Sequence, residues 1–229
     1  MLPVVNAEGL DLRAVSAALK GAAGNGPVVI QHAAHLAGLC AGMGRGEFTI
    51  EGDSGDYLGV LNDGATIRVK GNAGQYLADG MTRGTVVVEG NAGYGAGAYC
   101  YGGTIVVDGN AGDFAAVMNK GATIVVNGDV GDEVATYMLA GDLVITGNAG
   151  NNLGNYLIRG NIYIGGDWAS LGHNTLLAEM TAEDVEKVRR TLEPFGIEVD
   201  ARAFKKIVRL SEKPFYKAKA PVQAEQMRA

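Results

Sequence analysis

Cysteine, proline and tryptophan are scarce in this 229-residue chain, which contains 2, 5 and 1 of them. Cys40 and Cys100 form no C-x-x-C motif, which indicates a reducing compartment and excludes a zinc or iron–sulfur site held by the cysteines of this chain alone. No apolar run reaches the roughly 18 residues of a membrane span, and the first residues do not resemble a signal peptide. We therefore expect a cytoplasmic protein that does not contact a membrane.

Positive charge is also in deficit, with 19 Lys and Arg against 25 Asp and Glu and a net charge of -6. This balance argues against a nucleic-acid-binding protein, which neutralises phosphates with basic side chains. The charge is uneven along the chain. Residues 1–177 hold 8 basic and 16 acidic side chains, giving -8, whereas residues 178–229 hold 11 and 9, giving +2. An acidic body therefore carries a mildly basic tail.

Glycine is the residue in excess, at 36 of 229, or about 16% where roughly 7% is usual. The glycines recur in seven copies of a unit, Gly-x-hhh-x-Gly-Asn/Asp-x-Gly, in which h is apolar. The spacing between successive central glycines is 19 residues at every step, without insertion or deletion. These structural-repeat glycines are Gly52, Gly71, Gly90, Gly109, Gly128, Gly147 and Gly166.

A constant short period indicates a coil whose turns stack on one another, because a meander or sandwich tolerates loops of different lengths. The residues four and two positions before each central glycine are apolar, as in Ile67 and Val69 or Val86 and Val88. Period-two alternation is strand geometry with one face inward. The sequence therefore predicts an all-β fold, a right-handed parallel β-helix of seven 19-residue turns.

Two further features of the repeat lead to expectations about its turns. The Gly-Asn/Asp-x-Gly segments predict corners at which glycine takes positive φ. Seven residues after each central glycine stands a column of small side chains, which predicts a close approach of backbone to backbone, and His173 occupies this register at the last turn. The column comprises Cys40, Gly59, Ala78, Gly97, Ala116, Ala135 and Gly154.

The flanks of the repeat divide the chain into three parts. Residues 1–35 form an N-terminal cap with a strand and a helix from Asp11 to about Ala22 that plugs the first turn. Residues 36–177 form the Gly-rich β-helix. Residues 178–229 hold a helix over 181–193 and a basic docking tail, whose aromatic residues are Phe204, Phe215 and Tyr216. We expect this tail to dock a partner or a second copy, so that removing residues 202–229 leaves the coil folded; the alternative is that it folds back on its own acidic body.

Candidate chemical sites are weak. His32 and His35 are three residues apart but lack a third metal ligand, and we interpret them as core or cap residues. Residues 93–97 resemble a phosphate-binding loop, but their glycines recur in every turn, which favours a structural corner. His173 is interpreted as a cap residue rather than a general base. We assign no catalytic, cofactor-binding or metal-binding residue. Two columns of aromatic residues are predicted to pack between turns: Tyr57, Tyr76, Phe114, Tyr99, Tyr137 and Tyr156.

The seven tandem units and the Gly-rich stretch before them, over residues 36–172, resemble the GXGXG domain that closes the large subunit of glutamate synthase. As a free-standing chain, the sequence is most similar to the stand-alone β-helix subunit of N-methylglutamate synthases, also called methylamine-glutamate N-methyltransferases. The resemblance implies a structural, non-catalytic subunit of a complex that makes N-methyl-L-glutamate from methylamine and L-glutamate and releases ammonia.

The same resemblance implies two partners, a class II glutamine amidotransferase-like subunit and an FMN-binding glutamate synthase-like subunit with an iron–sulfur cluster, and leaves a homo-oligomer of the complex open. It implies no cofactor in this chain. The alternatives are the β-helix subunit of formylmethanofuran dehydrogenase, which is similar in its coil, or a glutamate synthase GXGXG subunit. An independent β-helix enzyme such as a polysaccharide lyase is disfavoured, because a gapless 19-residue period leaves no long loop for a site.

Overall fold

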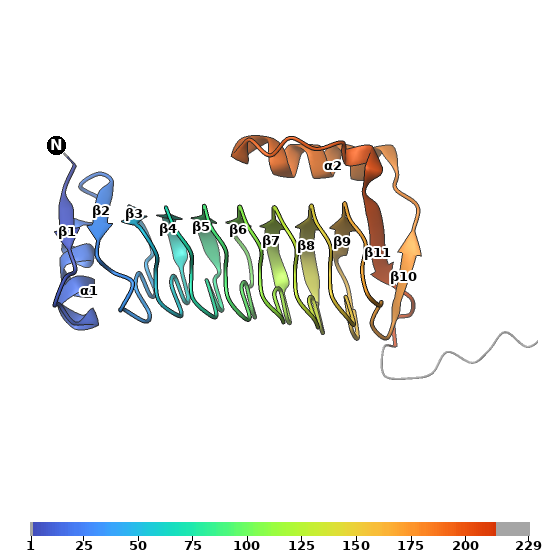
Figure 1. The fold of residues 1–229 in the computed structure, drawn as a ribbon, viewed down its shortest axis with the longest axis horizontal. Helices are drawn as coiled ribbons and strands as arrows, with labels where there is room; N and C mark the ends of the chain where they lie inside the picture. Colours follow the sequence, from blue (N-terminus) through green and yellow to red (C-terminus); the bar gives the residue numbers. More distant parts are fainter. Residues whose placement is uncertain (1, 214–229) are drawn as a thin grey trace, which may run out of the picture.

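The chain forms one elongated coil of stacked strands, shown in Figure 1. The computed structural model describes residues 2–213. Its described strands belong to a single 11-stranded sheet in the order β1-β2-β3-β4-β5-β6-β7-β8-β9-β11-β10, and the pairs from β1 to β9 are parallel. The strands are β1 (Val4–Asn6), β2 (Val28–Gln31), β3 (Glu47–Glu51), β4 (Asp63–Val69), β5 (Arg83–Val88), β6 (Thr104–Val107), β7 (Lys120–Val126), β8 (Ala140–Ile145), β9 (Asn161–Ile164), β10 (Thr175–Ala178) and β11 (Lys205–Arg209).

This β-solenoid of about seven turns confirms the predicted all-β fold, and its register follows the 19-residue period. Ile67 pairs with Val86, Val86 with Ile105, and Ile105 with Ile124 on successive turns. All four side chains are buried in one core. The right hand of the coil stays a prediction, based on the strong preference of parallel crossovers for that hand.

The expectation that the central glycines adopt positive φ is wrong for six of the seven, since Gly52 alone among them has it, at 90°. The other six central glycines are required because there is no room for a side chain at their positions. A Cβ added at Gly71 or at any of the five later central glycines would lie less than 3.0 Å from an oxygen of the preceding turn. The corners therefore exclude side chains because consecutive turns stack at backbone contact.

Positive φ occurs instead at the glycine that opens each unit, such as Gly84 at 97°, and, in the turns that follow Gly52 to Gly147, at three alternate positions five, seven and nine residues after the central glycine. In the second turn these are Tyr76, Ala78 and Gly80, with φ of 55°, 56° and 67°. Hydrogen bonds to both neighbouring turns hold this conformation: the Tyr76 amide donates to the Tyr94 carbonyl at 2.7 Å, and the Ala78 amide donates to the Leu58 carbonyl at 2.8 Å. The middle position is the small column, and its neighbours are side chains rather than backbone: a Cβ at Gly97 would lie 2.7 Å from Ile124 Cδ1.

The N-terminal cap agrees with the prediction. Helix α1 (Leu12–Ala22) begins after Asp11, whose side chain accepts a hydrogen bond from the Ala14 amide at 2.8 Å. Val15 and Leu19 are buried in the same core as the coil. The helix therefore closes the first turn, as its apolar face indicated.

The C-terminal cap departs from the prediction. After β10 come helix α2 (Ala182–Leu192) and the short 3-10 helices η1 (Glu193–Phe195) and η2 (Ala201–Ala203), and the chain then returns as β11 between β9 and β10, antiparallel to both. Phe204 and Ile207 are buried. For residues 204–209 the prediction of a tail that docks a partner is therefore wrong, and the alternative, that the tail folds back on its own chain, is confirmed. Phe215 and Tyr216 lie outside the described residues. A chain without residues 202–229 would lose a strand from inside the sheet.

Candidate functional site

The histidine pair predicted as core or cap residues lies at the N-terminal end of the coil, and both residues are exposed, so the core alternative is wrong. His32 and His35 line one shallow hollow of about 430 Å³ together with Glu8 and Asp11. The His35 Nε2 atom is 3.0 Å from the Leu10 carbonyl oxygen. Within residues 2–213, no group of three or more His, Cys, Asp or Glu side chains could hold a metal ion.

His173 sits in a different column from the one its spacing predicted. The last turn is one residue shorter than the others, since Ala149 bridges Trp168 at 19 residues but Leu153 bridges Leu171 at 18. The His173 ring consequently lies 4.9 Å from the ring of Tyr156. The prediction that it continues the small column is wrong, because a single-residue deletion shifts the register.

The Asn/Asp that follows each central glycine forms a hydrogen-bond ladder along the coil. Its side-chain Oδ1 accepts the backbone amide of the equivalent residue one turn later, at 2.6 to 3.0 Å over six consecutive steps. Both Asn and Asp can do this because the accepting atom is the same oxygen. The members are Asp53, Asn72, Asn91, Asn110, Asp129, Asn148 and Asp167. These repeated polar groups stabilise the turns, which favours a structural role over a ligand site.

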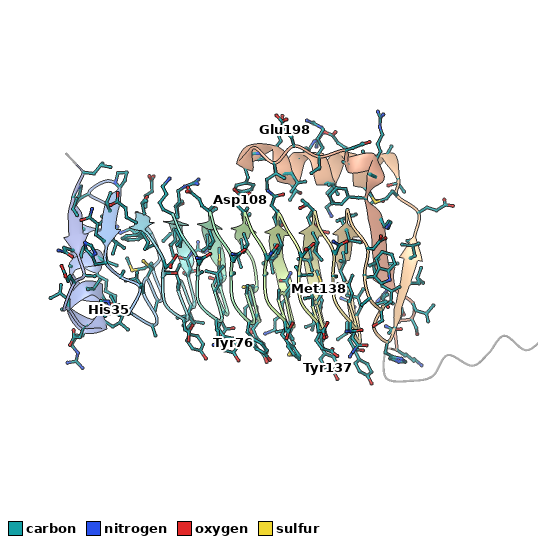
Figure 2. The ribbon with its side chains drawn as sticks, in the orientation of Figure 1. His35, Tyr76, Asp108, Tyr137, Met138 and Glu198 are labelled. Carbon is teal, nitrogen blue, oxygen red and sulfur yellow. The ribbon has the colours of Figure 1, made fainter. Side chains whose placement is uncertain are left out.

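Aromatic side chains form two ladders on the long edge of the coil opposite α2, where Figure 2 shows Tyr76 and Tyr137 pointing away from the strands. The proximal ladder is Tyr57, Tyr76, Tyr94 and Phe114, with ring centroids 4.9 to 5.4 Å apart. The distal ladder is Tyr137, Tyr156 and His173, with centroids 5.1 and 4.9 Å apart. The predicted packing between turns is confirmed for the Tyr57–Tyr76 and Tyr137–Tyr156 pairs. Tyr94 fills the place that Gly95 leaves open, which the column analysis missed.

The opposite, outward face of the strands is covered by α2 (Figure 1). A second apolar cluster joins Val188 and Leu192 of α2 to one column of the strands. This column, three residues before each central glycine, is Val87, Val106, Val125, Val144 and Tyr163. In the two turns before it the same position holds Thr49 and Arg68. Our sequence analysis missed this surface, although the switch from polar to apolar residues was a readable sign of a covering element.

One buried charge cluster fixes α2 to the coil. The Asp184 carboxylate accepts hydrogen bonds from the Tyr163 hydroxyl at 2.8 Å and from Lys206 Nζ at 2.7 Å, and it closes the capping box with Thr181. Burial raises the pKa of this carboxyl, but hydrogen bonds from Lys206, Thr181 and Tyr163 outweigh it and hold the pKa far below its usual range. Burial and the nearby Asp184 charge raise the pKa of Tyr163. These groups satisfy one another, so the cluster is structural.

The two cysteines are free and buried, and burial raises the pKa of each thiol to about 12. Neither therefore supplies a thiolate nucleophile at neutral pH. No helix in the described part of the chain is long and apolar enough to cross a membrane. What the described residues offer is a rod with an Asn/Asp ladder, an aromatic edge and a helix-covered face.

Comparison with known proteins identifies the same Gly-rich repeat. The GXGXG motif family matches residues 29–213, most of the chain. None of the curated proteins matches it. Among solved structures, a chain of the formyltransferase/hydrolase complex (FhcABCD) from Methylorubrum extorquens, solved with methylofuran, is 29% identical with a TM-score of 0.51, over 68% of this chain and 68% of that one. That neighbour is part of a multi-subunit complex, which supports a role within such an assembly. The chain belongs to the GXGXG motif family.

Proposed function

We propose that this chain is the structural, non-catalytic subunit of a glutamate-synthase-like complex that makes N-methyl-L-glutamate from methylamine and L-glutamate with release of ammonia. The observation that carries the proposal is the gapless stack of seven GXGXG units, which matches the GXGXG motif family over residues 29–213. The reaction then belongs to partner subunits, one similar to a class II glutamine amidotransferase and one that carries FMN and an iron–sulfur cluster. We place the complex in the cytoplasm.

The geometry supports a spacer. Seven turns at about 4.8 Å each make a rod roughly 30 Å long, and its Asn/Asp ladder repeats without interruption from Asp53 to Asp167. Stacked turns that share hydrogen bonds at each step resist bending, because a bend would break the ladder on one side. Such a rod can hold two catalytic subunits at a fixed separation.

A second function is favoured by the FhcABCD comparison, at 29% identity. In this alternative the chain is the β-helix component of a formylmethanofuran dehydrogenase-like or other formyl-transfer complex. The two functions differ in their partners: an amidotransferase-like protein and a flavoprotein in the first, formyl-transfer subunits in the second.

Reconstitution separates these functions. The full chain is co-expressed with amidotransferase-like and FMN-binding subunits from the same genome, and in parallel with formyl-transfer subunits. We expect a complex with the first pair that forms N-methylglutamate and ammonia, while the chain alone is colourless and inactive. Stable assembly with the formyl-transfer subunits, without binding to the first pair, would establish the alternative. A yellow or active isolated chain would contradict the non-catalytic role.

A further inference from the structure

The proximal ladder belongs to a larger exposed apolar surface. Eleven large apolar or aromatic side chains are exposed in the part of the chain that the structure describes, and five of them lie in the three turns that follow Gly52. Exposed apolar side chains that gather in one patch mark a binding surface, whereas scattered ones need no explanation. The five are Tyr57, Leu61, Tyr94, Tyr99 and Tyr101.

Contacts between turns join these side chains into one patch. Burial raises the pKa of the Tyr94 hydroxyl, and close neighbours add to the shift; they are Tyr76, Asp113 and Tyr99. Leu61 stands two turns before Tyr99 in the same column, and a Cβ at the intervening Gly80 would lie 2.9 Å from Leu61 Cδ2. Leu61 therefore covers the place that Gly80 leaves open. We call the patch the proximal face; its members are Tyr57, Leu61, Tyr76, Tyr94, Tyr99, Tyr101 and Phe114.

Two rings of the proximal face already bind a cation. Lys120 Nζ lies 4.0 Å from the ring centroid of Tyr101 and 5.7 Å from that of Tyr99, and it donates a hydrogen bond to the Tyr101 hydroxyl at 2.9 Å. Cations are attracted to the faces of aromatic rings, because the ring quadrupole is negative there. The proximal face therefore offers ring surfaces that suit ammonium and guanidinium groups.

Three carboxylates border the proximal face, those of Asp56, Asp79 and Asp113. None of them takes part in an ion pair within residues 2–213. Asp56 and Asp113 each directly precede a ring of the proximal ladder, and each accepts a backbone amide of the next turn at 2.8 Å. Burial raises the pKa of Asp79, and the charge of Lys120 offsets this effect only in part. The face therefore combines aromatic rings with uncompensated negative charge.

The length and the charge of the face decide which kind of ligand fits. Tyr57 and Phe114 are three turns apart in the repeat, about 14 Å at the spacing of adjacent strands. An extended peptide covers this length with about four residues. A symmetric dimer through the face would set the same patch of both copies together, and so the same carboxylates. Repulsion between these like charges disfavours a second copy of this chain.

We propose that the proximal face binds an extended segment of a partner protein that carries arginine or lysine side chains. The cations of this segment stack on the exposed rings and pair with Asp56, Asp79 and Asp113. The proposal rests on the proposed role of the chain as a subunit of a complex. It assigns the first four turns of the aromatic edge to one partner and specifies what that partner presents.

A fluorescein-labelled Arg-Gly-Arg-Gly-Arg amide tests the chemistry of the face without any partner subunit. Titration with the full chain should give saturable binding by fluorescence anisotropy, weaker as salt is added. Asp56→Asn with Asp113→Asn should weaken binding about fivefold, because asparagine keeps the oxygen that accepts the backbone amide but loses the charge. Tyr101→Ala should weaken it about threefold through the loss of one ring.

The matched control is Asp108→Asn with Glu198→Gln. It removes the same charge from exposed positions on the side of the coil opposite to Tyr76 (Figure 2). This pair should leave the affinity for the peptide within about twofold. Equal losses in the two charge pairs would show a general electrostatic effect, and that result, or the absence of saturable binding to the unmodified chain, would overturn the proposal.

Cross-linking in the assembled complex identifies the occupant. The full chain with Tyr101→p-benzoylphenylalanine is combined with the amidotransferase-like and FMN-binding subunits, and in parallel with the formyl-transfer subunits. We expect a link to a partner segment with arginine or lysine within about three residues of the linked position. No link, or a link to a second copy, to the same chain or to a segment without basic residues, would overturn the proposal. If neither set of subunits assembles with the chain, the proposed function fails, while specific binding of the peptide would still support the face as a site for basic segments.

Discussion

The coil and the C-terminal cap of this protein are held together in different ways. Each turn of the coil repeats the same few contacts, such as the hydrogen bond that the Asn110 amide donates to Asn91 Oδ1 at 2.8 Å. Each of these contacts is weak, but it recurs along the coil. The cap uses contacts that occur once, between segments far apart in sequence. Tyr163 and Lys206 donate hydrogen bonds to Asp184, and Phe204 belongs to the same apolar cluster as the Val87 to Tyr163 column. The stability of the coil is therefore distributed over its turns, whereas that of the cap is concentrated in a few side chains.

The largest effect is expected where the coil has no spare volume. Gly97→Leu should lower the free energy of unfolding by about 3–5 kcal/mol, from overpacking and from a left-handed backbone. A Cβ there would lie 2.7 Å from Ile124 Cδ1 and 3.3 Å from Ile105 Cδ1. Gly9→Leu is the matched control, because Gly9 has a φ of 70°, close to the 69° of Gly97, but no heavy atom within 4 Å. Equal losses in urea unfolding would show that volume does not limit the coil.

The cap should be nearly as sensitive to a single side chain. Phe204→Ala removes a buried ring that packs in one cluster with Tyr163, at a cost of about 3 kcal/mol. In the same experiment, a chain ending at Lys213 should unfold at the temperature of the full chain, whereas a chain ending at Ala201 lacks β11 and should melt lower. If the shorter chain melts at the same temperature, β11 is dispensable and the distinction between coil and cap fails.

The Asp184 cluster gives the cap a pH dependence that the coil ladder lacks. Asp184→Asn should cost about 2–3 kcal/mol at pH 7, because Lys206 and Tyr163 lose a charged acceptor. The folded pKa of Asp184 is depressed, so its stabilisation is complete above the unfolded value of about 3.9 and is lost as pH falls below it. The difference between wild type and variant in thermal midpoint should therefore shrink from pH 5 to pH 2. A constant difference would assign the loss to packing.

The smallest effect is expected within the ladder. Asn91→Ala removes the acceptor of the Asn110 amide and should cost about 1 kcal/mol. Asn91→Asp keeps Oδ1 and should cost less than half of that, since Asp129 fills the same place two turns later and accepts from Asn148 at 2.6 Å. Amide exchange at Asn110 would check the assignment: faster exchange in the alanine variant only is expected, and equal exchange in both would show that the side-chain oxygen is not the acceptor that matters.

Sequence reasoning succeeded where contacts are periodic. Ile67, Val86, Ile105 and Ile124 stack as their spacing predicted. It misjudged the central glycines, because a pattern shows where a side chain is excluded but not whether backbone angle or backbone contact excludes it. His173 was assigned to the wrong column because one deleted residue near Leu171 leaves no mark in the glycine period.

The sequence by itself determined the coil: its period, its inward columns, its helix at Asp11 and the absence of a readable catalytic motif all follow from local patterns. Only the tertiary structure decided that residues 205–209 return as a strand inside the sheet, that α2 covers the Val87 to Tyr163 column, and that Asp184 meets Lys206 across 22 residues. The physical reason is that a repeat specifies each contact seven times at a fixed separation. A contact made once between distant segments leaves no periodic signal, and burial and charge pairing select it only when the chain is folded.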